Sequence, residues 1–385
     1  MQVSSRSRTA AVVLAGFCAF LTIYAPQPLL PMLAREFGVS AAAISLVMTA
    51  TTVGVMLAAP FIGLVADRFG RKRVIVPAAF LMALPATLAA TSTGLRSLMF
   101  WRFWQGVFTP GIAAVTIAYI NEEWEMGAGA AMSAYVTGTV LGGFSGRMIA
   151  AVITSHASWR WAFATLGLLS AAGGIAMGKW LPGDRHFHRE PLLAAAAMRD
   201  MLRHIRNPRM QATCAVGFCV LFTLIATFTY VNFYLAAPPF HLSTQSLGLL
   251  FTVYLVGVVV TPFAGRSIDR VGHRFALAGS FAAGIAGILL TLIQYLPAVV
   301  LGLAILSTGV FITQAATSSY IGIAARDARA SAVGLYTMFY YAGGTLGSAL
   351  PGWFWNHGRW PACVALIVVV QTITIAVAVR RWRPD

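Results

Sequence analysis

The chain contains twelve runs of about 20 mostly apolar residues, and no other feature limits its fold as strongly. A helix rises about 1.5 Å per residue, so each run is long enough to cross roughly 30 Å of hydrocarbon. Apolar residues make up 58% of the sequence and charged residues only 10%, which excludes a soluble domain. We therefore expect an all-α membrane protein with twelve transmembrane helices. The predicted spans are 10–32, 43–66, 74–93, 97–119, 131–154, 160–181, 211–235, 245–268, 275–294, 297–319, 331–354 and 360–379.

The positions of the cations predict how these spans are oriented. With the N-terminus inside, 21 of the 27 lysines and arginines fall in cytosolic segments. The six others are Arg35, Arg96, Arg160 and Arg359 outside, and Arg102 and Arg147 within spans. Both termini are thus expected in the cytosol of a bacterium, with the protein in its inner membrane. The net charge of +16 then reflects topology, and no nucleic-acid partner is expected.

No catalytic, cofactor or metal site is indicated. The four cysteines lie in apolar runs without CxxC spacing. We therefore interpret them as small apolar side chains rather than as a disulfide or metal-binding set. The GFSG sequence at 143–146 fits the serine motif of an intramembrane protease, but that chemistry needs a histidine on a neighbouring helix. All seven histidines fall in or beside predicted loops. An enzyme is therefore not expected.

An internal repeat divides the chain into halves. Segments of the first half recur in the second at an offset of 201 to 203 residues. The matched segments are 16–18 with 217–219, 53–55 with 256–258, 63–70 with 265–272 and 142–146 with 343–347. Each half has six spans and starts on the same side, which predicts two pseudo-symmetric six-helix bundles arranged as parallel repeats. We assign 1–181 to the first bundle and 211–385 to the second.

Between the bundles, residues 182–210 form the only long predicted loop, which is basic and cytosolic. Five apolar residues in it fall near helical spacing, while Arg199, Arg203 and Arg206 mark another face. This pattern is typical of a helix lying on an anionic membrane leaflet. An ordinary tether between two bundles explains it equally well.

A charged turn follows the second span, in the sequence GLVADRFGRKR at 63–73. Gly70 permits a positive φ, and the basic residues after it hold the loop inside. Asp67 lies at the C-terminal end of a helix, where a carboxylate faces the negative end of the macrodipole and needs compensation. The turn residues are Gly63, Asp67, Arg68, Gly70, Arg71 and Lys72, with a second copy at Asp269, Arg270 and Gly272.

This turn resembles the loop signature of the major facilitator superfamily, and the resemblance extends over the whole chain. The sequences INEEWEMG, WRWAF and GGFSGR look most like the YnfM-type branch of drug:H⁺ antiporter-like bacterial efflux proteins. The resemblance implies that Asp67 docks near Ser331 and that the basic turn pairs with Glu122 and Glu123. These contacts would form a cytosolic gate that breaks as the bundles rock. The alternative is that all these charges only fix topology.

Glycines at helical spacing are expected to pack helices closely. They are Gly138, Gly142 and Gly146 in the fifth span, and Gly343, Gly344 and Gly347 in the eleventh. The superfamily's antiporter signature, G-P-x-x-G-G, aligns here. This chain departs from it with Gly143 at the proline and Arg147 at the last glycine.

Arg102 and Arg147 carry charge within the membrane, where none of the 11 acidic residues is predicted to lie. Such charges face a cavity, backbone carbonyls or a ligand. Two interpretations stay open: both arginines are tied to carbonyls and to groups such as Gln27, or they give a cavity a positive potential suited to an anion. The residues expected to line a cavity are Tyr24, Gln27, Arg102, Gln105, Arg147, Thr227, Tyr230, Gln314, Tyr336 and Tyr340.

These features favour a monomeric secondary transporter that moves a small organic solute by alternating access. By resemblance, proton-coupled efflux of a drug-like, sugar or metabolite substrate is expected. No titratable residue is evident at mid-membrane, so the proton would act at Asp67 or travel on the solute. One alternative is a uniporter or importer of an organic anion that uses Arg102 and Arg147. Another is a membrane receptor that does not transport.

Overall fold

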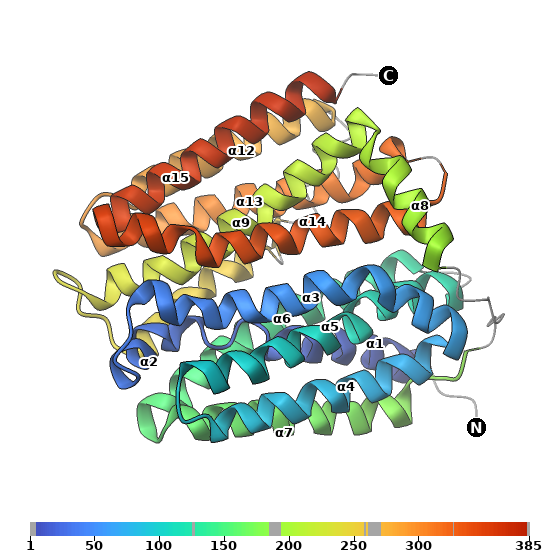
Figure 1. Cartoon of the computed structure of the whole chain (residues 1–385), viewed down its shortest axis with the longest axis horizontal. Helices are drawn as coiled ribbons and strands as arrows, with labels where there is room; N and C mark the ends of the chain where they lie inside the picture. Colours follow the sequence, from blue (N-terminus) through green and yellow to red (C-terminus); the bar gives the residue numbers. More distant parts are fainter. Residues whose placement is uncertain are drawn as a thin grey trace. The chain divides into compact units, whose positions relative to one another are not determined.

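The computed structural model describes residues 5–382 apart from 125–127, 185–193, 258, 261–270 and 326. These residues form helices joined by short turns, and no strand occurs among them (Figure 1). In chain order the elements are α1 (Ser5–Leu21), η1 (Gln27–Leu29), α2 (Leu30–Glu36), α3 (Ala41–Phe69), α4 (Arg71–Leu88), η2 (Ala89–Thr91), α5 (Leu95–Glu123), α6 (Ala128–His156), α7 (Trp159–Trp180), α8 (Ala194–Ile205), α9 (Pro208–Ala236), α10 (Thr244–Leu250), η3 (Phe251–Leu255), α12 (His273–Leu290), α13 (Leu296–Ala324), α14 (Arg329–Ala349) and α15 (Pro351–Arg381).

The helices group into two compact units. Unit 1 comprises Met1–Leu29 and Ala50–Ala194, and unit 2 comprises Leu30–Thr49 and Ala195–Asp385. The start of α3 therefore belongs to unit 2, where the Thr49 and Ser348 hydroxyl oxygens lie 2.8 Å apart. The sequence-based boundaries at 181 and 211 stay a prediction about the two bundles.

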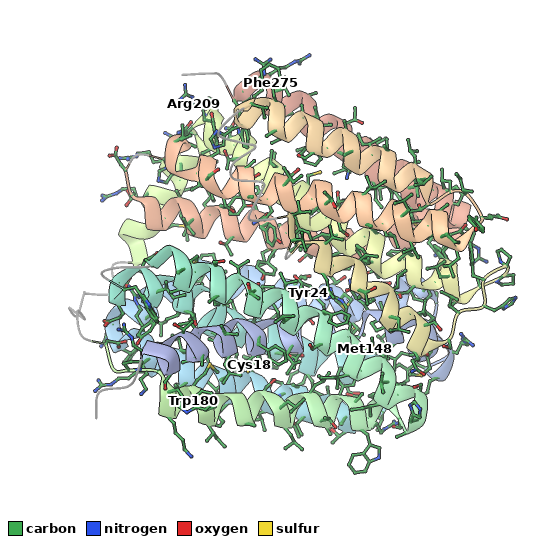
Figure 2. The ribbon with its side chains drawn as sticks, turned by 180° about the vertical axis from the view of Figure 1, so that it is seen from behind. Cys18, Tyr24, Met148, Trp180, Arg209 and Phe275 are labelled. Carbon is green, nitrogen blue, oxygen red and sulfur yellow. The ribbon has the colours of Figure 1, made fainter. Side chains whose placement is uncertain are left out.

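The outer surfaces of the helices are apolar, as expected for helices that face lipid. Large apolar side chains are exposed along the long helices, among them Trp161 (67%), Leu168 (64%) and Phe275 (72%). Phe275 points outward from α12 (Figure 2). Nine helices in the described part of the chain are long and apolar enough to cross a membrane. The chain is therefore a multi-pass all-α membrane protein.

Three of the twelve predicted spans are not among those nine. The first, 10–32, is interrupted: α1 ends at Leu21 and η1 begins at Gln27. Pro26 and Pro28 explain this correction, because proline has no N–H to continue a helix. The eighth is described only as far as α10 and η3, with most of its second half outside the described residues. The eleventh, 331–354, is divided between two elements: it begins in α14 and continues into the start of α15, since Leu350 between them has helical angles. The helical backbone is interrupted only later, at Gly358 and Arg359.

Close glycine contacts hold the helices of each unit together. In unit 1, α6 packs on α1, and in unit 2, α14 packs on α9 (Figure 1). Cβ atoms added at Gly138, Gly142 and Gly146 would lie within 2.2 Å of the backbone oxygens of Val13, Phe17 and Leu21. Cβ atoms added at Gly343 and Gly347 would lie 2.0 and 2.6 Å from those of Phe218 and Phe222. The contacts of Gly142 and Gly146 in unit 1 correspond to those of Gly343 and Gly347 in unit 2 at an offset of 201 residues. Both units therefore repeat the same helix contact.

Gly142→Ala tests this contact. We expect a loss of about 1–3 kcal/mol of stability, because the added methyl would lie 2.2 Å from a backbone oxygen that cannot rotate away. Gly129→Ala, on the same helix with open space around the new Cβ, should be neutral or slightly stabilising. The apparent melting temperature of each variant in detergent measures the effect. Equal melting temperatures for both variants would contradict the packing role.

Candidate functional site

Arg71 joins two carboxylates at one end of unit 1. Its guanidinium donates to both oxygens of Glu122, at 2.9 Å from Nε to Oε2 and 2.6 Å from Nη2 to Oε1. Its Nη1 lies 2.6 Å from Oδ1 of Asp67, four residues earlier and on the other side of the break at Gly70. A bidentate arginine–carboxylate pair is among the stronger ionic contacts in proteins. The structure thus ties the ends of α3, α4 and α5 through one cation, using three residues that the sequence singled out.

Asp184 completes this arrangement, which we call the turn cluster (Asp67, Gly70, Arg71, Lys72, Glu122 and Asp184). Asp184 Oδ1 accepts a hydrogen bond of 3.1 Å from the backbone N–H of Lys72, at the start of α4. The Lys72 ammonium donates to the backbone oxygen of Leu181. A carboxylate at this position satisfies an unpaired N–H and faces the positive end of the helix dipole.

Gly70 makes this geometry possible. It has φ of 98°, in the range that the sequence predicted for it and that side chains other than glycine disfavour. A Cβ there would also lie 2.5 Å from Asp184 Oδ2. Sequence reasoning missed Asp184 because it stands in the segment assigned to the linker. The available signal was its place three residues after the end of a span, because the helix that begins after Gly70 leaves N–H groups in need of an acceptor.

The pKa of the Asp184 carboxyl is raised from 3.8, chiefly because partial burial disfavours the charged form, although the Lys72 and Arg71 N–H groups oppose this. A raised folded-state pKa means that ionised Asp184 costs the fold some stability. That cost is absent below the ordinary pKa and fully present above the raised one.

Asp184→Asn should therefore be at least as stable as the parent at pH 7, because the amide oxygen still accepts from Lys72 without burying a charge. The advantage should disappear as the pH falls towards 4. Asp184→Ala should lose about 1 kcal/mol at pH 4, as other lost helix caps do, and less at pH 7, where it also removes the cost of the buried charge. Melting temperatures at pH 7 and 4 measure this. An Asn variant as unstable as the Ala variant would show that the charge itself is required.

The other predicted gate residues are placed as follows. Gly63 lies in open space, and Arg68 stacks at 5.7 Å over the ring of the adjacent Phe69. Glu123 is buried, and its backbone oxygen accepts from Arg8 Nη2 at 2.7 Å. In the second copy, Gly272 has φ of 79°, whereas Asp269 and Arg270 lie outside the described residues.

Arg102 stabilises the break in the first span. It is fully buried, and Nη1 donates to the backbone oxygen of Thr22 at 2.9 Å while Nη2 donates to that of Ile23. In a continuous helix the Thr22 oxygen would bond to the N–H of residue 26, which is a proline. Arg102 supplies the donor that Pro26 lacks. It also donates to Gln105, one turn along α5.

Arg147 lies in the same unit beside the segment that follows the break. Its Nε donates to Gln27 Oε1 at 2.8 Å, and its Nη1 donates to the backbone oxygen of Gly143 at 2.7 Å. Its guanidinium carbon lies 5.0 Å from the ring centre of Tyr24, within the range of a cation–π interaction. Arg147 is 2% exposed. The structure thus brings together Tyr24, Gln27 and Arg147.

In unit 2, α13 and α14 bring three of the predicted cavity residues together. The Tyr336 hydroxyl donates to Gln314 Oε1 at 3.1 Å, and the Tyr336 and Tyr340 rings have centroids 6.0 Å apart. Thr227 and Tyr230 belong to α9 and are fully buried, with the Tyr230 hydroxyl donating to the Ser348 backbone oxygen at 3.0 Å. Tyr230 therefore fastens α9 to α14.

Comparisons with known proteins agree with this architecture. A family model for the Major Facilitator Superfamily matches residues 12–348 and, in an overlapping second match, 232–385. The inner membrane transport protein YnfM of Escherichia coli is 31% identical over 376 residues, covering 97% of this chain and 90% of that protein. The MFS-type transporter YybF of Bacillus subtilis is 30% identical over 371 residues, covering 96% and 92%.

Solved structures show the same fold at low identity. The nucleoside transporter NupG superposes with a TM-score of 0.82 at 14% identity, covering 97% of this chain and all of that one. The human organic anion transporter MFSD10 superposes with a TM-score of 0.76 at 17% identity, covering 97% and 99%. The fold is that of a membrane transporter with two six-helix bundles. The chain belongs to the Major Facilitator Superfamily, and its relatives are transporters rather than enzymes.

Proposed function

We propose that this protein is a secondary transporter that exports a small organic solute by alternating access, coupled to proton entry. The observation that carries this proposal is the turn cluster, in which Arg71 holds Asp67 and Glu122 together. Ionic contacts at helix ends are local electrostatic elements of the kind that bias a two-state transition. The alternative, in which these charges only fix topology, predicts no effect of the pair on flux.

Asp67 offers a route for the coupling. Its side chain is 31% exposed and contacts Arg71 through a single oxygen, so a proton can reach it. Protonation would remove the negative charge and weaken this contact, while the bidentate Glu122 pair would remain. Gate opening would then depend on proton binding. Transport of the proton on the solute is the other possibility that fits the family resemblance.

Flux through proteoliposomes tests the proposal. The purified protein would be assayed with ethidium, a labelled sugar and labelled benzoate, with and without an imposed pH gradient. We expect protein-dependent flux of at least one probe that falls when the gradient is collapsed. Flux unchanged by collapsing the gradient would remove proton coupling and favour a uniporter. Absence of flux for a broad panel of solutes that still bind would favour a receptor.

Transport of an organic anion is the second candidate, favoured by the buried charge of Arg147 beside Tyr24 and Gln27. Arg147→Gln should then reduce benzoate flux while leaving ethidium flux within about twofold of the parent. Uniform loss of flux with poor stability in detergent would instead assign Arg147 a packing role. Arg102 is the weaker candidate for solute binding, because its donors are directed to Thr22, Ile23 and Gln105.

We further propose that the protein acts as a monomer in a bacterial inner membrane with both termini in the cytosol. The distribution of arginines and lysines supports this orientation. A reporter fused to the C-terminus that is active only in the cytosol would test it. Activity of a second C-terminal reporter, one that works only outside the cytosol, would show the opposite orientation. The turn cluster would then lie on the outer side of the membrane.

A further inference from the structure

The helix α8 (Ala194–Ile205) carries two exposed stripes of different chemistry. Met198, Leu202 and Ile205, spaced by four and three residues, are 44%, 56% and 39% exposed. The exposed side chains of Arg199, Arg203 and Arg206 follow the same spacing one residue later. The apolar stripe is therefore left uncovered directly beside a basic one. α8 also runs across the ends of α13 and α14 rather than along them (Figure 1).

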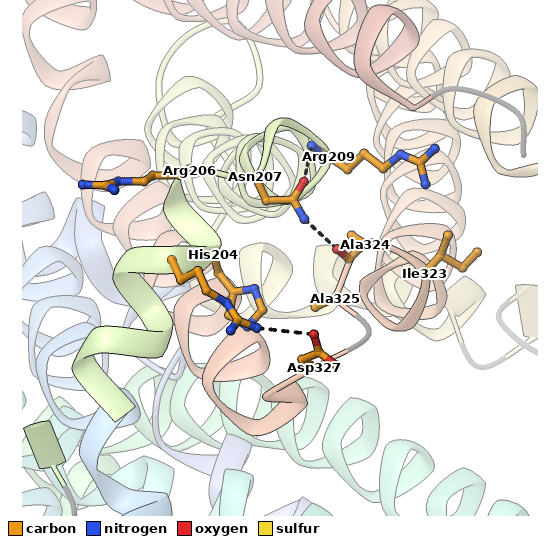
Figure 3. A pocket seen from close by; sticks show the side chains of 9 residues that line it. His204, Arg206, Asn207, Arg209, Ile323, Ala324, Ala325 and Asp327 are labelled. Carbon is orange, nitrogen blue, oxygen red and sulfur yellow. Dashed lines mark hydrogen bonds and ion pairs between the residues drawn. The ribbon is translucent and has the colours of Figure 1, made fainter. Parts of the chain in front are cut away.

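A pocket of about 480 Å³ lies where α8 meets α9. It is lined by Arg203, His204, Arg206, Asn207, Arg209 and the segment that follows α13. Asn207 fixes its inner wall, since its side chain accepts from the Arg209 N–H at 3.0 Å and donates to the Ala324 oxygen at 2.8 Å (Figure 3). Among the described residues that line the pocket, three are arginines and one is a carboxylate, Asp327, which lies 3.5 Å from Arg203. The lining therefore has an excess of positive charge.

The directions of the arginines distinguish between possible anions. The side chains of Arg206 and Arg209 diverge on either side of Asn207 (Figure 3). A single free phosphate would be held by donors that converge on it. Diverging arginines instead suit a surface with many phosphates side by side. A membrane surface offers that arrangement together with apolar material for the neighbouring stripe of α8.

We propose that α8 and the arginine pocket form a binding surface for anionic phospholipids of the leaflet next to this loop. The stripe of Met198, Leu202 and Ile205 lies in the headgroup–acyl boundary, and the arginines bind headgroup phosphates. Because α8 continues into α9 through Asn207 and contacts Asp327, lipid charge then acts on the ends of three helices of unit 2. This goes beyond the transport proposal and holds whatever the solute is.

A fluorescence experiment on the full-length protein tests the surface. The four native cysteines are buried, so Met198→Cys can be labelled selectively with the environment-sensitive dye NBD. The labelled protein would be placed in nanodiscs of phosphatidylcholine alone or with phosphatidylglycerol, and quenching by spin-labelled lipid would be measured. We expect NBD to be quenched, and α8 docked, in the discs that contain phosphatidylglycerol.

Charge-matched variants separate the pocket from general electrostatics. Arg206→Gln with Arg209→Gln should lower the ratio of docked to undocked α8 about thirty-fold, from the usual contribution of two basic residues near an anionic surface. Arg274→Gln with Arg380→Gln removes the same charge elsewhere in unit 2 and should leave the ratio unchanged. Three results would overturn the proposal: NBD that stays in water in both lipids, equal effects of the two pairs, or docking induced by inorganic phosphate in phosphatidylcholine alone.

Discussion

Arg102→Ala is expected to cause the largest loss of stability among single substitutions in unit 1. The change removes the donor for the Thr22 and Ile23 backbone oxygens at the break between α1 and η1. A buried acceptor left without a donor costs about 1–3 kcal/mol, and here two are lost together. The cavity left by a fully buried arginine adds to this cost. The melting temperature, measured by the reaction of the buried cysteines with a thiol-reactive dye, should fall by several degrees.

Two further variants make the Arg102 result specific. Arg96→Ala removes an exposed arginine from the same helix and should melt like the parent. Arg102→Lys keeps the charge but replaces a planar fork with a single ammonium, so it should recover part of the loss. If Arg102→Ala melted like Arg96→Ala, the break would not depend on this side chain. A cavity role for Arg102 would then become the better interpretation.

Local periodicity predicted most of the fold. A helix that crosses lipid must satisfy its own backbone groups, so an apolar run of sufficient length has few alternatives. This is why α9 (Pro208–Ala236) and α13 (Leu296–Ala324) lie within a few residues of their predicted spans. The positive φ of Gly70 was predictable for a similar reason, since a tight turn between two long helices requires it.

Features set by contacts between distant segments were not predictable in the same way. The sequence placed Pro26 and Pro28 inside one continuous span, although they interrupt it. Whether a proline kinks or ends a membrane helix depends on whether another segment supplies the missing donor, and here Arg102 does so from 80 residues away. Asp184 was missed because its partner, the N–H of Lys72, lies 112 residues before it. The packing of 30–49 with unit 2 likewise depends on tertiary contacts.

Asp67→Asn should abolish most transport while the protein still inserts, folds and melts near the parent temperature. Asparagine keeps the size and the hydrogen-bonding oxygen of aspartate but loses the charge that attracts Arg71 at 2.6 Å. Because both groups are partly exposed, the static contribution of the pair to stability is expected to be about 1 kcal/mol or less. Flux is more sensitive to this contact than stability is. Loss of the contact shifts the equilibrium between the open and the closed gate, and that shift changes the rate of every transport cycle.

Flux and melting temperature measured together decide whether Asp67 acts in the transport cycle or in the fold. Asp67→Glu retains the charge on a longer side chain and should keep partial flux, whereas Arg68→Gln changes the neighbouring exposed residue and should keep nearly all of it. Near-normal flux in Asp67→Asn would mean that the turn only sets topology. A contact that only gates transport can be removed without unfolding the helices it joins. A variant that lost flux and also melted far below the parent would therefore show that the ionic contact holds unit 1 together.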